Sequence, residues 1–179
     1  MYKELQIELS RFGKAVVKQA RTNLTKQQRE DTKDLYNSIK YDLEVNRQSF
    51  SLSFEMLEYG IYVDQGVKGK SSSNKAPRSP FRFGSGTGKK GGLTRSIEKW
   101  VKRKNIKFRN KKGQFITSKQ TSFLISRSIY QKGIKPSLFF TKPFEAAFNR
   151  LPDELIVQFG LDINDFLEES LKQPLNANV

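Results

Sequence analysis

The apolar positions near the start of the chain recur at spacings of three and four residues, with charged residues between them. The positions that follow this spacing are Leu5, Leu9, Phe12, Val16 and Ala20. One face of an α-helix repeats about every 3.6 residues, so this stripe is typical of an amphipathic helix. The pattern predicts a helix over residues 2–24.

From Ile39 onward the apolar positions alternate with polar ones. They are Ile39, Tyr41, Leu43 and Val45 in a first run, and Phe50, Leu52 and Phe54 in a second. Successive side chains of a β-strand point to opposite faces, so alternation predicts strands with one buried face. We expect two antiparallel strands joined by a turn near Asn46 and Arg47.

The middle of the chain has a different pattern. Residues 66–92 are rich in Gly and Ser and contain Pro77 and Pro80, which predicts a long loop without regular structure in the absence of a partner. Two short helices should follow, separated by a turn at 111–113 and ended by Gly133. Their apolar markers are Leu93, Ile97, Trp100 and Val101 for the first, and Phe123, Leu124, Ile125, Ile129 and Tyr130 for the second.

Near the C-terminus the helical spacing returns. Pro143 suits the first turn of a helix whose apolar positions include Phe144, Ala147, Phe148 and Leu151. Pro152 is expected to break or restart this helix, and Gly160 weakens the pattern that follows. That later stripe consists of Leu155, Phe159, Ile163, Phe166, Leu167 and Leu171.

Charge is distributed unevenly. Residues 1–65 contain 10 Lys and Arg against 10 Asp and Glu, residues 66–135 contain 20 against the single acid Glu98, and residues 136–179 contain 3 against 7. Like charges as dense as those of the middle section repel one another unless an opposite charge compensates them. We therefore predict contact with a polyanion, either nucleic acid or an acidic neighbouring subunit; the alternative is a solvated basic loop.

In residues 100–109, cations are interleaved with the rings of Trp100 and Phe108. This pattern suits phosphate neutralisation with occasional base stacking. A basic helix whose rings pack inward gives the same pattern, and we expect both rings to be core and the cations to face a partner. No sequence-specific DNA motif is evident, so binding should be electrostatic and sensitive to salt. The candidate contacts are Lys89, Lys90, Arg95, Lys99, Lys102, Arg103, Lys104, Lys107, Arg109, Lys111 and Lys112.

Catalysis is not expected. The chain has no His and no Cys, which removes the usual general base, the thiolate nucleophile and most ligands of zinc, iron–sulfur clusters and haem. Residues 84–89 resemble a phosphate-binding loop, but the spacing is one residue short and Lys90 replaces the Ser or Thr that would hold magnesium. Asp31 and Lys33 have the Asp-x-Lys form of some metal-dependent nucleases, but lie in a polar connector. We expect no cofactor and no metal.

Export and membrane insertion are not expected either. No run of about 18 apolar residues occurs, and the first ten residues include Lys3, Glu4 and Glu8, unlike a signal peptide. The absence of Cys fits assembly in a reducing cytosol.

Three separated stretches stand out: TKDLYNSI at 32–39, YGIYVDQG at 59–66 and KPFEAAF at 142–148. They resemble, in order, landmarks of the tail-completion or head–tail joining proteins of long-tailed bacteriophages. In that family a Thr-Gly-x-Leu-x-x-Ser-Ile-like segment leads into the first strand, a Tyr-x-x-x-Val-Glu-x-Gly-Thr-like segment follows the sheet, and a helix led by Pro-Phe closes the fold. Here Lys33 replaces the usual Gly, Asp64 the common Glu and Val67 the common Thr.

The resemblance implies an α+β fold in which a long N-terminal helix packs on a small antiparallel β-sheet, with a basic loop and helix insertion and a C-terminal helix. Residues 1–66 and 136–172 would form the core domain, 67–135 the insertion and 173–179 a C-terminal tail.

The family-motif residues would be structural, and none needs to do chemistry. Thr32 and Ser38 would shape the start of a strand, Tyr59 and Tyr62 would pack beneath the sheet, and Gly66 would permit a turn with positive φ. The full set is Thr32, Leu35, Ser38, Ile39, Tyr59, Tyr62, Val63, Asp64, Gly66, Pro143 and Phe144.

The resemblance also implies a non-catalytic virion protein, made in the host cytoplasm and assembled at the neck as a ring, commonly of six subunits. Its partners would be other copies of itself, the head connector or stopper, and the tail tube or tail terminator proteins. The insertion would face an acidic neighbour or genomic DNA in the channel, and residues 66–92 would order on docking. The alternative is a non-specific nucleic-acid-binding protein that uses residues 89–112.

Overall fold

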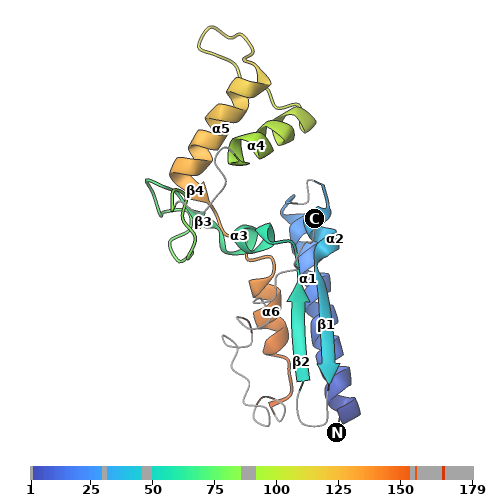
Figure 1. Cartoon of the computed structure of the whole chain (residues 1–179). Helices are drawn as coiled ribbons and strands as arrows, with labels where there is room; N and C mark the ends of the chain where they lie inside the picture. The colour runs from blue at the N-terminus through green and yellow to red at the C-terminus, as the bar shows by residue number, and fades with distance from the viewer. Residues whose placement is uncertain are drawn as a thin grey trace. The chain divides into compact units, whose positions relative to one another are not determined.

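The computed structural model of the chain describes residues 2–29, 32–45, 50–85, 92–153, 156 and 167 (Figure 1). The fold is α+β, as predicted. It divides into two compact units: unit 1 consists of residues 1–64 and 137–179, and unit 2 of residues 65–136. Unit 2 therefore contains the whole basic section of the sequence.

Helix α1, Tyr2–Lys26, is the longest element of unit 1. Its predicted apolar stripe is confirmed, because Leu9, Phe12, Val16 and Ala20 are all buried. Leu24 continues the stripe for one more turn and is also buried. The side chain of Leu5 lies outside the described residues.

Strands β1, Lys40–Val45, and β2, Phe50–Glu55, form the predicted antiparallel hairpin. Tyr41 pairs with Phe54, Leu43 with Leu52 and Val45 with Phe50, so the apolar positions of both strands share one face. The predicted turn residues, Asn46 and Arg47, lie outside the described residues.

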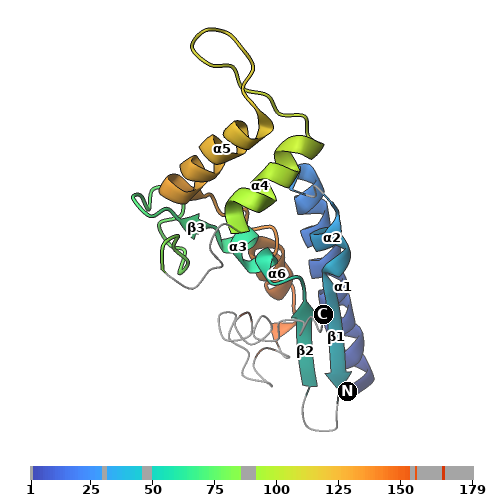
Figure 2. The same cartoon turned by 45° about the horizontal axis from the view of Figure 1, so that its top comes forward.

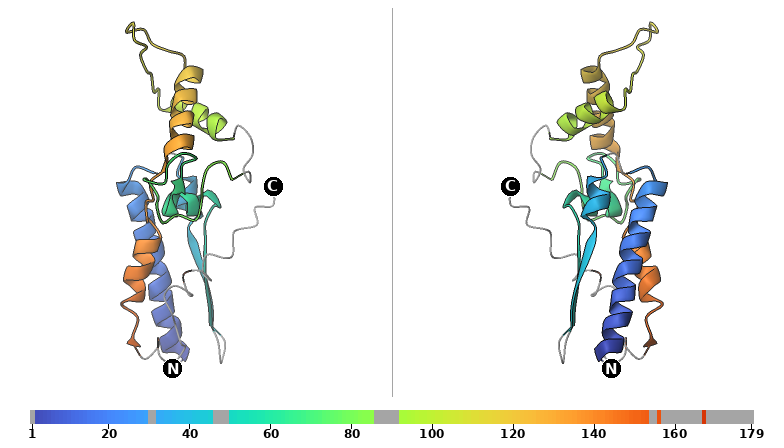
Figure 3. Two further views of the ribbon diagram at one scale, coloured as in Figure 1. Left: turned by 90° about the vertical axis from the view of Figure 1, so that its left-hand side faces the viewer. Right: turned by 90° about the vertical axis from the view of Figure 1, so that its right-hand side faces the viewer.

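Two helices cover the apolar face of this hairpin. Figure 3 shows α1 and α6, Thr141–Phe148, on the same side of β1 and β2. Ring centroids lie 5.2 Å apart for Phe12–Phe144, which joins α1 to α6. They lie 5.2 Å apart for Phe54–Phe140 and 5.9 Å apart for Phe54–Phe144, which join β2 to the start of α6; all three pairs have edge-to-face geometry. Each buried phenyl ring contributes about 1.5–3 kcal/mol through burial, so this cluster is the main source of stability in unit 1.

Two short helices flank the hairpin: α2, Asp34–Ser38, and α3, Tyr59–Gln65. The prediction that Tyr59 and Tyr62 pack beneath the sheet is wrong, because their side chains are 44% and 38% exposed. The cause is that residues 59–65 form a helix whose buried side carries Gly60 and Asp64. Helical spacing then places the two tyrosines on the outer side.

Unit 2 is closed at its base by two short strands, β3, Val67–Lys68, and β4, Gly133–Ile134, which pair antiparallel. The predicted helices are α4, Gly92–Arg103, and α5, Ser118–Lys132, which pack against each other (Figure 2). Gly133 ends α5, as expected.

Apart from β3, residues 66–85 form the predicted loop without helices or strands, and hydrogen bonds hold its backbone. Lys68 donates its N–H to Phe81 O (2.8 Å) and accepts the N–H of Phe83 (2.9 Å), so the two ends of the segment lie side by side. Ser79 is buried and donates its Oγ–H to Gly66 O (2.7 Å). The Gly, Ser and Pro content disfavours regular strands here. The backbone polar groups are satisfied instead by these individual hydrogen bonds and by the buried Ser79 hydroxyl. Residues 86–91 lie outside the described part of the chain.

The C-terminal helix begins as predicted, with Pro143 as the third residue of α6. Of the stripe predicted beyond Pro152, the structure describes only Ile156 and Leu167, both of which pack against the core of unit 1. Leu155, Phe159, Ile163, Phe166, Leu171 and the tail 173–179 lie outside the described residues.

Candidate polyanion-binding surface

The nine described cations among the predicted contacts are all exposed on unit 2. Four lie on α4: Arg95, Lys99, Lys102 and Arg103. Five lie on the segment that joins α4 to α5: Lys104, Lys107, Arg109, Lys111 and Lys112. The other two predicted contacts, Lys89 and Lys90, are outside the described residues. The surface is therefore one basic helix continued by one basic loop.

The loop has a defined backbone. Residues 104–117, hereafter the basic hairpin, fold back so that Arg109 and Phe115 form an antiparallel bridge and Ile116 donates its N–H to Phe108 O (2.9 Å). At the tip, Asn110 Oδ1 accepts the N–H of Lys112 (2.9 Å) and of Gln114 (3.0 Å). An Asn that accepts backbone N–H groups in this way fixes a turn. Lys111 and Lys112 are therefore held at a structured tip.

The rings in this region are not the core that the sequence predicts. Phe108 is 40% exposed and Trp100 only half-buried, so the expectation is wrong for Phe108 and holds in part for Trp100. The reason is that Phe108 lies on the basic hairpin, beyond the end of α4. On this hairpin Phe115 is 60% exposed, and its ring is covered by Arg109, whose Cζ lies 4.4 Å from the ring centroid. Lys107 Nζ lies 6.0 Å from the same centroid.

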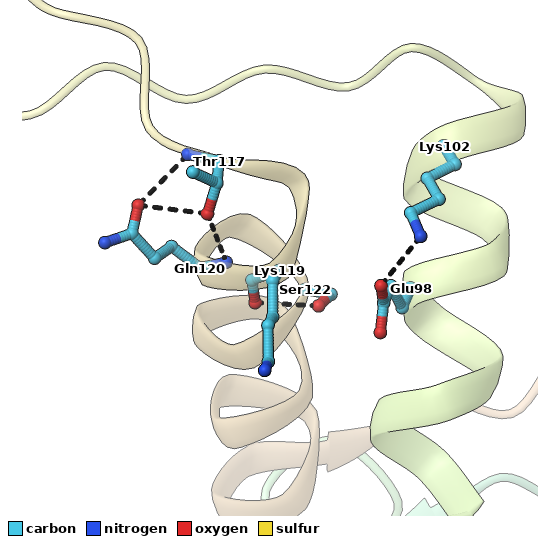
Figure 4. A network of polar contacts seen from close by, with 6 residues as sticks. All are labelled: Glu98, Lys102, Thr117, Lys119, Gln120 and Ser122. Atoms are coloured by element: carbon cyan, nitrogen blue, oxygen red, sulfur yellow. Dashed lines mark hydrogen bonds and ion pairs between the residues drawn. The ribbon is translucent and has the colours of Figure 1, made fainter.

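Helix α5 starts at a capping box that the sequence analysis missed. Thr117 Oγ1 accepts the N–H of Gln120 (3.2 Å), and Gln120 Oε1 accepts the N–H of Thr117 (3.0 Å), as Figure 4 shows. A Thr followed three residues later by Gln is the sequence signal for this motif. It fixes the point at which the basic hairpin ends and the helix begins.

The buried side of α5 carries small polar side chains, and two of its apolar side chains are exposed. Thr121 and Ser122 are fully buried, whereas Phe123 and Leu124 are 56% and 48% exposed. Figure 4 shows Ser122 on the side of α5 that faces α4. Small side chains there allow the two helices to approach closely. Phe123 and Leu124, two of the apolar positions that predicted this helix, therefore do not lie on its buried face.

One ion pair lies on α4. Lys102 Nζ is 2.8 Å from Glu98 Oε1, and this hydrogen bond, with the charge of Lys102, holds the pKa of Glu98 below its ordinary value. Glu98 is the one acid between residues 66 and 135. Unit 2 therefore carries many more cations than carboxylates.

In unit 1 several of the family-motif residues lie in or against the core. Leu35, Ile39, Pro143 and Phe144 are buried and Val63 is partly buried. Ser38 Oγ donates to Leu35 O (2.9 Å) and accepts the N–H of Leu57 (3.1 Å), which ties the start of β1 to the end of β2. Thr32 Oγ1 donates to Asp34 beside the start of α2.

Asp64 has a capping role that is not evident from the sequence. Its carboxylate is 2% exposed and accepts the N–H of Phe140 (2.8 Å), the N–H of Thr141 (3.3 Å) and the Thr141 hydroxyl (2.5 Å). These donors lie at the N-terminus of α6, where Phe140 has no side-chain cap to offer. Burial raises the pKa of Asp64, although the Thr141 and Phe140 hydrogen bonds act in the opposite direction. Asp64 thus supplies the cap of α6 from a distant part of the chain.

Two residues within these motifs have left-handed backbone. Gly66 has φ 72°, which confirms the predicted turn with positive φ. Lys33, which stands where the resembled family usually has Gly, has φ 60° and ψ 4°. This region costs a residue with a Cβ atom about 1–2 kcal/mol and costs glycine little.

The described residues carry few features of other site types. They contain no group of three or more His, Cys, Asp or Glu side chains that could hold a metal ion, and no helix long and apolar enough to cross a membrane. A groove of about 450 Å³ runs between α1 and α6. Its lining includes apolar residues such as Phe12 and Pro143 and the acid Glu8, whose carboxylate accepts a hydrogen bond from Arg11. Asp31, the predicted nuclease carboxylate, lies outside the described residues.

Comparison with known proteins adds no relative: no protein-family model, curated protein or solved structure matches the chain.

Proposed function

We propose that the chain is a structural subunit of the neck of a long-tailed bacteriophage, which forms a ring with other copies of itself and joins the completed tail to the head. In this role it contacts the head connector or stopper on one side and the tail tube or tail terminator on the other. The observation that carries the proposal is the convergence, in unit 1, of the three sequence stretches that resemble this family.

The three stretches are far apart in the sequence but share one core. Leu35 and Ile39 of the first stretch and Phe144 of the third belong to the same buried cluster, and Val63 of the second packs against it. Asp64 of the second stretch caps the helix that contains Pro143 and Phe144. Short motifs that matched by chance would have no reason to meet, so their convergence supports the resemblance.

The backbone conformation at one departure from the family pattern and at one match to it also supports the resemblance. Lys33 is left-handed where the resembled family has Gly, and Gly66 is left-handed where the family also has Gly. A left-handed residue is the physical reason for a glycine at a turn. At position 33 the backbone therefore has the conformation that the family's glycine would adopt, although the residue here is Lys33.

The charge distribution supports assembly rather than an isolated monomer. Unit 2 is strongly basic, whereas residues 136–179 carry an excess of acids. Segments of opposite charge in one chain favour a heterologous contact, in which the basic unit of one copy meets the acidic segment of the next. Such a contact generates a ring when its rotation closes. The exposed Phe123 and Leu124 on α5 add apolar area to a surface of this kind.

Electron microscopy of a lysate from the encoding phage, with this gene interrupted, tests the proposal. We expect filled heads lying apart from finished or overlong tails, because a missing neck subunit leaves both parts made but not joined. An in-frame silent change in the same gene is the control and should give normal particles. Intact, infectious particles from the interrupted gene would contradict the proposal and would favour a separate nucleic-acid-binding role for residues 89–112.

A further inference from the structure

The basic hairpin carries features that an insertion used only as a spacer would not need. Within residues 104–117 it contains Lys104, Lys107, Arg109, Lys111 and Lys112 and no acid. Its backbone is fixed by the Arg109–Phe115 bridge and by the Asn110 turn. Concentrating like charges on a fixed framework is unfavourable unless a polyanion approaches them.

We propose that the basic hairpin, together with the exposed cations of α4, binds the phosphate backbone of duplex DNA without reading its sequence. Duplex DNA carries one negative charge for about every 1.7 Å of its axis, a density that a group of closely spaced lysines and arginines can neutralise. Lys111 and Lys112 lie at the tip of the hairpin, and Lys107 and Arg109 lie on the arm that leads to the tip.

The aromatic residues position these cations. Arg109 lies against the exposed Phe115 ring with its Cζ 4.4 Å from the centroid, and Lys107 approaches the same ring at 6.0 Å. Stacking of this kind holds a guanidinium in place while its N–H groups remain turned to solvent, which lowers the ordering cost of a phosphate contact. Phe115 is therefore a positioning residue for Arg109.

Duplex DNA fits the surface better than an acidic protein does. A protein interface has an apolar centre with charges at its rim. On the basic hairpin the exposed rings are instead interleaved with cations, as Arg109 and Lys107 on Phe115 show. The other two exposed large apolar side chains in the described part of unit 2, Phe123 and Leu124, lie on α5 rather than on the hairpin.

The inference goes beyond the proposed function, since a neck ring could join head and tail without touching DNA. The two can also fail separately, because DNA binding is measured on the purified chain and joining is measured on particles. The assay is fluorescence anisotropy of a labelled, mixed-sequence duplex of about 30 base pairs, titrated with the full chain between about 50 and 200 mM NaCl. We expect binding that weakens steeply with salt.

The decisive comparison uses two triple variants of equal charge change. Arg109→Gln, Lys111→Gln and Lys112→Gln together neutralise the hairpin and should weaken binding by about tenfold or more at about 100 mM NaCl, and lower the salt slope by about 2 to 3. Lys14→Gln, Lys18→Gln and Lys26→Gln together neutralise exposed cations of α1 and should leave affinity within about twofold.

A second pair tests the positioning role of the ring. Phe115→Ala should weaken binding by about threefold, whereas Phe123→Ala, which removes an exposed ring on α5, should leave it unchanged. All variants change exposed side chains, and circular dichroism checks that each is folded. Absence of duplex binding at about 50 mM NaCl, or equal losses in the two triple variants, overturns the inference and leaves an acidic protein as the partner of this surface.

Discussion

Replacing Asp64 with Ala should destabilise unit 1 by about 3 kcal/mol or more, because two buried backbone N–H groups and one hydroxyl lose their acceptor. The N–H groups of Phe140 and Thr141 both point at this carboxylate, and Phe140 offers no cap of its own. Removal of a buried carboxylate also removes its desolvation cost, but an unsatisfied N–H costs about 1–3 kcal/mol, so the loss should dominate. Urea unfolding followed by circular dichroism measures the difference.

Asp64→Asn is the matched control. Its amide oxygen can still accept from Phe140, and its amide nitrogen can donate to the Thr141 hydroxyl, so most of the stability should remain. If the Asn variant loses as much as the Ala variant, the capping role assigned to Asp64 is wrong.

The same pair gives a pH dependence with a defined sign. Burial raises the pKa of Asp64 above its ordinary value of 3.8, so the folded protein binds this proton more tightly than the unfolded chain does. The free energy of unfolding should therefore fall, relative to the Asn variant, as the pH rises from about 4 through the raised pKa. Above that range the difference should stay constant. A relative gain in stability with rising pH would show that the hydrogen bonds outweigh burial.

Replacing Gly133 with Ala should disrupt the base of unit 2, at a cost of about 3 kcal/mol or more. Gly133 has φ 83° and ψ −178°, a region that essentially only glycine occupies. A Cβ atom there would lie 2.3 Å from Val67 O and 2.6 Å from Gly69 N, both backbone atoms that cannot rotate away. The β3–β4 pair would have to separate, so trypsin should cleave unit 2 faster in this variant than in the parent.

Gly113→Ala is the control for Gly133→Ala. Gly113 also has positive φ, at 79°, but a Cβ atom there would meet nothing within 4 Å. The expected cost is about 1 kcal/mol, from backbone strain alone. Equal destabilisation by the two substitutions, measured by thermal unfolding, would contradict the close packing described for the base of unit 2.

Sequence periodicity predicted correctly the helices and strands that bury one regular face. Helix α1 and the β1–β2 hairpin each bury one regular face, so the spacing of Val16 and Ala20 or of Leu52 and Phe54 was sufficient. On α5 the apolar positions predicted the helix correctly, although Phe123 and Leu124 face outward while Thr121 is buried. Periodicity identifies a helix but does not say which of its faces a neighbour will cover.

The candidate site was only partly predictable. The cations of the basic hairpin were evident from charge density, and their exposure follows from the cost of burying them unpaired. The exposure of Phe108 was not evident, because it depends on where α4 ends. The capping role of Asp64 could not be found from local sequence, since its acceptor bonds join residues 76 and 77 positions apart.

The most direct measurement of the neck assignment is in vitro joining. Heads and tails from the lysate made without the chain are mixed with the purified chain, and joined particles are counted by electron microscopy alongside the infectious titre. The account predicts that the added chain restores joined, infectious particles, whereas the destabilised Gly133→Ala variant restores fewer. A folded, purified chain that leaves heads and tails apart would contradict it.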